Sequence, residues 1–353
     1  MDSSIELIKK LYNENNLHKE EISYLLENLN EESKKLLFES SEKTCRKHYN
    51  GRVFMRGLIE FSNVCGRHCK YCGLRSPNTG VERYRLSKEE ILACCKEGYE
   101  LGYRTFVLQS GEDPFYAVDV MLDIIYSIKN SFPDTALTLS IGERSIEEYR
   151  KFYEAGADRY LLRHETISKK LYKELHPYME LDERVKCLYD LKEIGYQVGA
   201  GFMVGLPGQT FSDIADDLLF LKELSPQMIG IGPFIPHSST PLRDEKGGTV
   251  DDTLPVIAVA RLLLPDSLIP ATTAMGTLKE NGRELALKAG ANVVMPNLTP
   301  TSARPKYQLY ENKICLQDAA AGCRVCIEKR INSAGFTIDM GRGDHPAFMN
   351  SYS

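Results

Sequence analysis

Three cysteines in the first quarter of the chain are close enough in sequence to hold iron. Cys65, Cys69 and Cys72 form a C-x₃-C-x₂-C run. Thiolates bind iron–sulfur clusters readily, and three of them leave one iron of a [4Fe–4S] cube open to another ligand. The run therefore favours a catalytic cluster over an electron carrier, which would supply four cysteines. Zinc is the alternative, but a fourth ligand is hard to find, because His68 lies directly beside Cys69.

Composition and charge exclude several classes of protein. The 353 residues include 44 Lys and Arg against 49 Asp and Glu, a net charge of −5 without the basic excess of a nucleic-acid binder. There is no apolar run of about 18 residues, so we expect no contact with a membrane. The first residues lack the basic start and apolar core of a signal peptide. We therefore expect a cytoplasmic protein with reduced cysteines, of which Cys45, Cys94, Cys95 and Cys187 read as small buried side chains.

The elements that must position the three cysteines alternate regularly along the chain. Helical spacing of apolar residues predicts a helical extension over 1–50. Short apolar runs typical of strands follow at 54–61, 105–109, 137–140, 160–162, 198–204, 228–231, 269–273 and 292–295. Helices are predicted between them at 87–101, 118–130, 145–155, 182–194, 211–224, 251–264 and 282–289. Eight such units indicate an α/β fold closed as a (β/α)₈ TIM-type barrel over 51–300, with a C-terminal segment over 301–353; an open doubly wound sheet is the alternative.

Polar residues follow the predicted strands at their C-terminal ends, where barrel enzymes carry their active sites. The first strand runs into the cysteines, and later strand ends supply amides, carboxylates, an arginine and hydroxyls: Gln109, Ser110, Gly111, Glu112, Ser140, Arg163, Glu165, Thr272, Thr273 and Met295. Singly, each has a structural explanation, such as strand packing for the two threonines. Together on one face of a barrel they predict an active site.

The cysteine run, with the aromatic Tyr71 just before its last cysteine, resembles the signature of the radical SAM superfamily. The resemblance implies that the open iron binds the amino and carboxylate groups of S-adenosylmethionine (SAM). One electron then splits SAM into methionine and a 5′-deoxyadenosyl radical, so the cofactors carry the chemistry and the protein positions them.

Further segments narrow the resemblance to the branch that contains biotin synthase, methylornithine synthase and the HydE family of [FeFe]-hydrogenase maturases. The similarity to the HydE family covers residues 51–326 in many separate blocks, among them 107–113, 160–166, 204–210, 229–237 and 270–277. Biotin synthase is disfavoured, because it holds a sulfur-donating cluster on strand cysteines and none of the predicted strands contains a cysteine.

The resemblance also implies roles for individual residues. Ser110-Gly111-Glu112 stands where relatives have Gly-Gly-Glu and is expected to bind the amino group of SAM. Arg184 is expected to pair with the carboxylate, for which a guanidinium is well shaped, although a helical arginine is otherwise more often a solvated surface residue. The complete set of implied cofactor-binding residues is Tyr71, Gln109, Ser110, Gly111, Glu112, Ser140, Glu165, Arg184, Met203 and Leu206.

Three more cysteines, Cys315, Cys323 and Cys326, follow the last predicted strand in a C-x₇-C-x₂-C arrangement. A site in this tail cannot easily enter a barrel mouth that already holds a cluster, so we expect it at the surface. By resemblance it holds an auxiliary [2Fe–2S] or [4Fe–4S] cluster with one ligand that is not cysteine. Three reduced thiols without a metal are the alternative.

The resemblance implies an anionic substrate, an iron dicarbonyl cyanide unit carried by cysteine, used to assemble the di-iron subcluster of the hydrogenase. Its expected contacts are Arg163, Thr272, Thr273, Met295 and Tyr307, with His237 less specific. Implied partners are the other hydrogenase maturation proteins and a reductant such as ferredoxin or flavodoxin. Two other functions stay open: a radical SAM mutase of an amino acid, of the methylornithine synthase type, and a non-enzymatic iron–sulfur scaffold.

Overall fold

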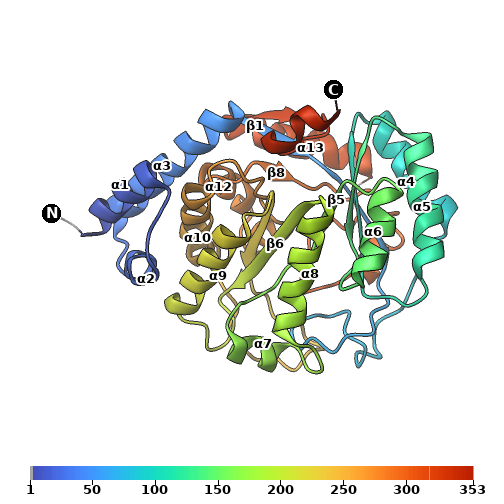
Figure 1. Cartoon of the computed structure of the whole chain (residues 1–353), viewed down its shortest axis with the longest axis horizontal. Coiled ribbons are helices and arrows are strands. Elements are labelled where there is room, and N and C mark those ends of the chain that lie inside the picture. Colours follow the sequence, from blue (N-terminus) through green and yellow to red (C-terminus); the bar gives the residue numbers. More distant parts are fainter. Residues whose placement is uncertain (1–2, 318, 353) are drawn as a thin grey trace.

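The structure, a computed structural model, describes residues 3–317 and 319–352 (Figure 1). The helical extension expected at the N-terminus is confirmed as α1 (Ser3–Glu14), α2 (Lys19–Glu27) and α3 (Glu31–Tyr49). Asn30 begins α3 as its N-cap and accepts a hydrogen bond of 2.9 Å from the backbone nitrogen of Ser33. The extension packs on the outside of the barrel, where α2 contacts α9 (Phe211–Leu224) and α3 contacts α10 (Val250–Leu263) and α12 (Gly282–Lys288).

Parallel strands form the inner layer. One sheet has the order β2-β3-β4-β5-β6-β7, with β2 (Gly57–Ser62), β3 (Thr105–Ser110), β4 (Ala136–Ser140), β5 (Arg159–Leu161), β6 (Gln197–Val204) and β7 (Met228–Pro233). A second, three-stranded sheet has the order β8-β1-β9, with β8 (Val293–Val294), β1 (Arg52–Met55) and β9 (Thr337–Asp339). Every pair within these sheets is parallel.

Isolated bridges close the two sheets into one barrel, so the open doubly wound alternative is wrong. The three parallel bridges that join their edges are Met228 with Leu268, Pro270 with Val293, and Leu58 with Asn297. The backbone nitrogen of Ala271 also donates to Val293 at 2.8 Å, and that of Leu58 donates to Pro296 at 2.8 Å. The barrel predicted from the alternation of strands and helices is confirmed.

Two strand predictions need correction. The run 269–273 forms bridges but no continuous strand, because Pro270 cannot donate to a ladder and Thr272 is already the N-cap of helix α11 (Thr273–Leu278). The run 54–61 is two strands: β1 pairs with β8 and β9, whereas β2 pairs with β3. The strand β9 from the C-terminal segment is too short to show a period in the sequence, and it pairs with Arg52, Val53 and Phe54 of β1.

The helices predicted around the barrel are present as α4 (Lys88–Glu100), α5 (Val118–Ser131), α6 (Ile146–Glu154), α8 (Leu181–Ile194), α9, α10 and α12. Figure 1 shows them outside the strands. Ser87, Ser145 and Thr210 begin three of these helices with capping boxes. Elements that the sequence did not reveal are α7 (Lys169–Leu175), α11, α13 (Ala320–Ser333), and the 3₁₀ helices η1 (Arg304–Lys306) and η2 (Pro346–Tyr352). In the described residues, no helix has the length and apolar character to cross a membrane.

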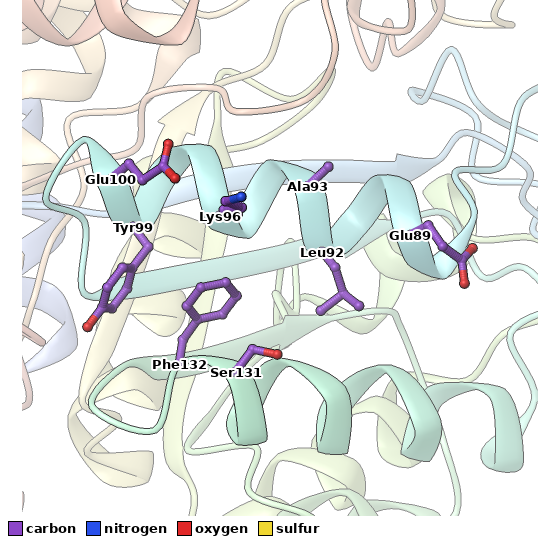
Figure 2. Close-up of a pocket in the computed structure, with 8 residues that line it drawn as sticks. All are labelled: Glu89, Leu92, Ala93, Lys96, Tyr99, Glu100, Ser131 and Phe132. Atoms are coloured by element: carbon purple, nitrogen blue, oxygen red, sulfur yellow. The ribbon is translucent and has the colours of Figure 1, made fainter.

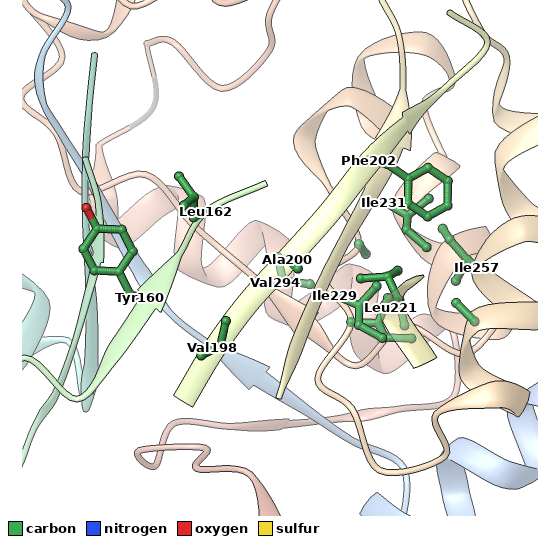
Figure 3. Packing of buried hydrophobic residues seen from close by; sticks show 14 of the residues in the cluster. Tyr160, Leu162, Val198, Ala200, Phe202, Leu221, Ile229, Ile231, Ile257 and Val294 are labelled. Carbon is green, nitrogen blue, oxygen red and sulfur yellow. The ribbon is translucent and has the colours of Figure 1, made fainter. Parts of the chain in front are cut away.

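The period of two along each strand sorts side chains between the outer core and the barrel interior. Phe202 of β6 and Ile231 of β7 pack outward with Leu221 of α9 and Ile257 of α10 (Figure 3). The neighbouring Met203 points the other way and lines the interior. The core therefore lies between strands and helices and leaves the interior to residues of the site.

The C-terminal segment seals the base of the barrel. The guanidinium of Arg159, fully buried on β5, forms an ion pair of 2.6 Å with Asp344, which also accepts from Gln197 at 2.7 Å. The hydroxyl of Thr105 donates to the carbonyl of Arg342 at 2.7 Å. With this end of the barrel filled, the strands' C-terminal ends remain for function.

Candidate active site

A cavity of about 350 Å³ lies at the C-terminal ends of the strands, inside the barrel. Side chains from the loop after β2, from later strand ends, from α8 and from the C-terminal segment line it. Its size is in the range of pockets that hold small molecules. Three sulfur atoms, four cations and three carboxylates face it, from Cys65, Cys69, Cys72, Arg67, Arg163, Arg184, Lys313, Glu60, Glu112 and Glu165.

A second hollow, of about 520 Å³, lies on the outside of the barrel between α4 and α5 (Figure 2). The rings of Tyr99 and Phe132 contact each other there, with centroids 5.1 Å apart. No cysteine lines this groove; its side chains are Glu89, Leu92, Ala93, Lys96, Tyr99, Glu100, Ser131 and Phe132. The cavity inside the barrel, where the sulfur and charged groups meet, is therefore the candidate active site.

The loop that carries the first three cysteines is held by backbone hydrogen bonds on three sides. Gly66 donates to Glu112 at 3.0 Å, Lys70 donates to Leu175 at the end of α7 at 2.9 Å, and Gly73 donates to Leu309 at 2.9 Å. The loop has no regular secondary structure of its own. Its shape thus depends on contacts with distant parts of the chain.

The three cysteines repel one another when they are ionised as thiolates, so a positively charged iron–sulfur core would stabilise them. Burial raises the pKa of Cys69 to about 12, and a negative charge on Cys65 adds to that rise. Burial likewise raises the pKa of Cys72, with further contributions from charges on the other two cysteines. In the described residues, no three His, Cys, Asp or Glu side chains converge as ligands of a single ion would. In a cubane each thiolate binds a different iron, so this donor set suits a cluster.

Beside the cysteines, two arginines and two glutamates form one connected network. Arg67 pairs with Glu112 at 2.6 Å and with Glu143 at 3.0 Å. Arg184, only 8% exposed, pairs with Glu143 at 2.7 Å and donates to the carbonyl of Arg163 at 3.0 Å. Burial alone would lower the pKa of Arg184, but the charges of Glu143 and Glu112 together with Tyr172 and Tyr71 outweigh it and raise the pKa. Arg184 therefore stays charged at the cavity wall.

Arg163 and Glu165 form a second charged pair, 3.0 Å apart. The backbone of Glu165 lies in the left-handed region with φ of 65°, a conformation that costs energy for a side chain other than glycine. It is held there because its nitrogen donates to Gly201 at 3.0 Å and its carbonyl accepts from Met203 at 3.2 Å. One buried Nη of Arg163 is engaged in this ion pair, whereas its buried Nε has no hydrogen-bond partner in the described residues and can donate to a ligand in the cavity.

Hydroxyls and a buried ion pair also line the cavity. The Oγ1 of Thr272 is buried and has no hydrogen-bond partner in the described part of the chain. The hydroxyl of Tyr307 accepts from Gln109 at 3.2 Å, and the ammonium of Lys313 pairs with Glu60. These groups can receive a polar ligand.

The structure brings most of the expected site residues to this one cavity. Those that line it are Cys65, Cys69, Cys72, Tyr71, Gln109, Ser110, Gly111, Glu112, Ser140, Arg163, Glu165, Arg184, Met203, Thr272, Thr273, Met295 and Tyr307. Leu206 does not: it is buried behind the wall, where it packs with Leu175 against the lining residues Met203 and Phe234. His237 also lies outside, against Gly73.

The second group of cysteines lies partly inside the protein rather than on its surface. Cys323 is 3% exposed and Cys315 is half-buried, whereas Cys326 is exposed. Cys315 and Cys323 line a small cavity that shares Leu58, Thr273, Met295 and Lys313 with the larger one. The expectation of a surface site failed because α13, which carries Cys323, packs its apolar side against the barrel.

Several groups of the site were not recognised in the sequence. Glu143 lies three residues after the expected Ser140, and Arg67 lies between two of the cysteines. Glu60 does carry a signal, since it is a lone carboxylate in the predicted strand 54–61, at an alternate position to the outward Ile59 and Phe61. Lys313 carries no such signal, because the segment around it shows neither the helical nor the strand spacing of apolar residues.

Comparisons with known proteins agree with this geometry. The model of the Radical SAM superfamily matches residues 59–221. The [FeFe] hydrogenase maturase subunit HydE of Thermotoga maritima is 52% identical over 299 residues, 85% of each chain. The 3-methylornithine synthase of Methanosarcina barkeri is 32% identical over 269 residues, 74% of this chain and 75% of the relative. A crystal structure of methylornithine synthase (PylB) superposes with a TM-score of 0.81 at 27% identity, over 94% of this chain and 97% of the other. With its cysteine loop at the mouth of a closed barrel, the chain thus belongs to the radical SAM superfamily and, within it, to the HydE family of [FeFe]-hydrogenase maturases.

Proposed function

We propose that this protein binds a [4Fe–4S] cluster through Cys65, Cys69 and Cys72 and cleaves SAM reductively during maturation of an [FeFe]-hydrogenase. Membership of the radical SAM superfamily implies both cofactors. When bound, the cluster supplies one electron that splits SAM into methionine and a 5′-deoxyadenosyl radical. The observation that carries the proposal is the meeting of three half-buried thiols with a charged network in one cavity inside a closed barrel.

The charged network beside the cysteines is suited to the two charged ends of the methionine part of SAM. Arg184 uses its Nε and one Nη in the protein, so further N–H donors remain for a carboxylate. Glu112 lies over Gly142 and next to the backbone of Ser110 and Gly111, where it can accept from an amino group. Tyr71, fixed by a hydrogen bond of 3.0 Å between its hydroxyl and His176, offers a half-buried ring for the adenine.

The other half of the cavity is proposed to hold an anionic substrate, an iron dicarbonyl cyanide unit bound by cysteine and supplied by another maturase. Arg163 and Thr272 support this, because each has buried polar atoms that find no hydrogen-bond partner in the described structure. Thr273, Met295 and Tyr307 complete the wall. A ferredoxin or flavodoxin is proposed as the electron donor.

The second group of cysteines is proposed to hold an auxiliary cluster of the [2Fe–2S] or [4Fe–4S] type. Cys315 and Cys323 interact directly, which raises the pKa of Cys323. The guanidinium of Arg283 lies 3.9 Å from the sulfur of Cys315 and provides a positive charge beside the thiolates. A Cys323→Ala variant should lose the iron of the auxiliary cluster, while a Cys94→Ala variant, which changes a buried cysteine of α4, should keep it.

Anaerobic reconstitution with iron and sulfide, followed by reduction with SAM, tests the proposal. The wild type should form 5′-deoxyadenosine and the Cys69→Ala variant should not. With the cysteine-bound iron complex added, adenosylated sulfur should appear among the products. A reducible cluster that gives no 5′-deoxyadenosine would reject the enzymatic function and favour a non-enzymatic scaffold.

The identity to 3-methylornithine synthase favours one alternative, a radical mutase of an amino acid. Such an enzyme abstracts hydrogen from its substrate. Deuterium transfer from an amino acid into 5′-deoxyadenosine, without any adenosylated sulfur, would favour the mutase.

A further inference from the structure

A buried ion pair in the wall of the cavity has no role in the function proposed above. The ammonium of Lys313 is hydrogen-bonded to one oxygen of Glu60, and the two residues are 8% and 1% exposed. The other oxygen of Glu60 accepts from the amide of Asn297 at 2.8 Å. Both Lys313 and Glu60 line the cavity. Burying two charges is costly, so a pair placed inside a ligand cavity calls for an explanation beyond stability.

The two charges reach the interior from opposite ends of the chain. Glu60 lies on β2 at the inward position of the alternation, and Lys313 arrives 253 residues later from the segment after η1. The Lys313 ammonium also donates to the carbonyl of Tyr307 at 3.0 Å and lies 4.9 Å from the centre of its ring. Lys313 therefore fixes both the main chain and the ring of Tyr307, whose hydroxyl is bonded to Gln109.

One N–H donor of the Lys313 ammonium is left for a ligand. A lysine has three N–H donors, and Glu60 and the Tyr307 carbonyl use two of them. The cations beside the cysteines, Arg67 and Arg184, are engaged with Glu112 and Glu143. Arg163, through its unpartnered Nε, and Lys313 therefore both offer N–H donors to an anion in the cavity.

We propose that Lys313 is a further specificity-determining residue, whose ammonium, oriented by Glu60, binds the anionic substrate and holds Tyr307 against it. The inference rests on the proposed function, because it assigns a contact to the substrate named there. The pairing with Glu60 balances the charge of Lys313 within the protein. The position also matters for the auxiliary site, since Lys313 lies two residues before Cys315 and lines the cavities of both sites.

Direct binding to the reconstituted protein, without reductant, tests the inference. The probe is the cysteine-bound iron dicarbonyl cyanide complex, whose CO and CN stretching bands in the infrared report both occupancy and local charge. The variants are Lys313→Met, Lys313→Arg and the double variant Glu60→Gln/Lys313→Met, which removes both charges and leaves no unpaired carboxylate. The control is Lys306→Met, which removes an exposed lysine of the same segment that pairs with Glu82.

We expect the Kd of the complex to rise at least about tenfold in Lys313→Met and in the double variant, with shifted CN bands. Lys313→Arg should retain most of the affinity, and Lys306→Met should bind like the wild type. If the double variant regains wild-type affinity together with wild-type stability, Lys313 is structural and the inference is wrong. Unchanged Kd and bands in Lys313→Met would also overturn it. A wild-type protein that does not bind the complex would reject the proposed substrate, and this inference with it.

Discussion

Gly111 lies directly against Cys65: a Cβ at position 111 would stand 2.6 Å from the Cβ of Cys65 and 2.3 Å from the carbonyl oxygen of Val64. Both distances are shorter than a van der Waals contact, so no other residue fits without moving the cysteine loop. The contact is reinforced on both sides, because Gly111 donates to Ser62 at 3.1 Å and Gly66 donates to Glu112 at 3.0 Å. The end of β3 and the first cysteine are therefore positioned by one another.

We predict that Gly111→Ala disturbs cluster assembly rather than the fold of the barrel. The new methyl group should push the loop at Cys65 outward and lower the iron content. 5′-Deoxyadenosine formation should fall at least about tenfold, since misplacing reacting groups by about 1 Å can cost about 100-fold in rate. The control is Gly80→Ala, because Gly80 is exposed and its nearest neighbour would be 3.6 Å from a new Cβ. Wild-type iron content and turnover in Gly111→Ala would show that the loop can adapt.

A second prediction concerns Arg184, which is expected to bind the carboxylate of SAM. In Arg184→Met, Glu143 still has Arg67 at 3.0 Å, so its carboxylate is not left alone. The loss of a charge-assisted hydrogen bond to a ligand costs about 1.5–3 kcal/mol, which is about a 10- to 100-fold rise in KM for SAM. Lys186→Met, from the exposed side of the same helix, should leave KM unchanged. An unchanged KM in Arg184→Met as well would place the SAM carboxylate elsewhere.

The barrel could be predicted because each strand and helix shows its own regular spacing of apolar residues in the sequence. The period of two in β6, with Phe202 outward and Met203 inward, is visible in the sequence alone. The strand predictions fail where tertiary contacts determine the secondary structure. Pro270 and Thr272 look like strand residues, yet one lacks a donor and the other caps a helix. β9 is three residues long and exists because β1 offers it an edge.

The site residues that directly follow a strand could be predicted, whereas those from other parts of the chain could not. The cysteines and the 110–112 segment are contiguous in sequence, so motif and placement identify them together. Lys313 could not be found this way, because its position depends on one contact with Glu60, which lies 253 residues away. Leu206 was expected to contact the cofactor, but it lies behind the cavity wall and packs against Met203.

A third prediction uses the unsatisfied hydroxyl of Thr272. Because its Oγ1 has no partner in the described structure, Thr272→Val should leave the free energy of unfolding equal or slightly higher. If the hydroxyl binds substrate, the Kd of the iron complex should rise about three- to tenfold. Thr253→Val should behave in the opposite way, because that buried hydroxyl donates to Thr249 at 2.7 Å on the outer helix α10. Its loss should cost about 1 kcal/mol of stability without affecting binding. Reduced stability with unchanged Kd in Thr272→Val would contradict the assignment.

The last prediction concerns the pH dependence of stability, which should originate in part at the sealed base of the barrel. Burial raises the pKa of Asp344, but the charge of Arg159 and hydrogen bonds from Arg342 and Gln197 outweigh it and hold the pKa at about 2. The pKa is lower in the folded than in the unfolded chain, so this carboxylate stabilises the fold at pH values above about 4. Its contribution, on the order of 2 kcal/mol, is lost as the pH falls from about 4 to 2.

Asp344→Asn should therefore lower the free energy of unfolding by about 3–5 kcal/mol at pH 7, because it leaves the buried charge of Arg159 without its ion-pair partner. The difference in free energy of unfolding between wild type and variant should shrink by on the order of 2 kcal/mol as the pH falls from about 5 to 2. Anaerobic urea unfolding at each pH measures this difference, and comparing the two proteins at equal pH cancels the acid lability of a cluster. Asp339→Asn, which removes a surface pair with Arg52, should change stability by less than about 1 kcal/mol throughout. A gap that stays constant with pH would mean that Asp344 acts through packing, and that its charge does not hold the C-terminal segment in the barrel.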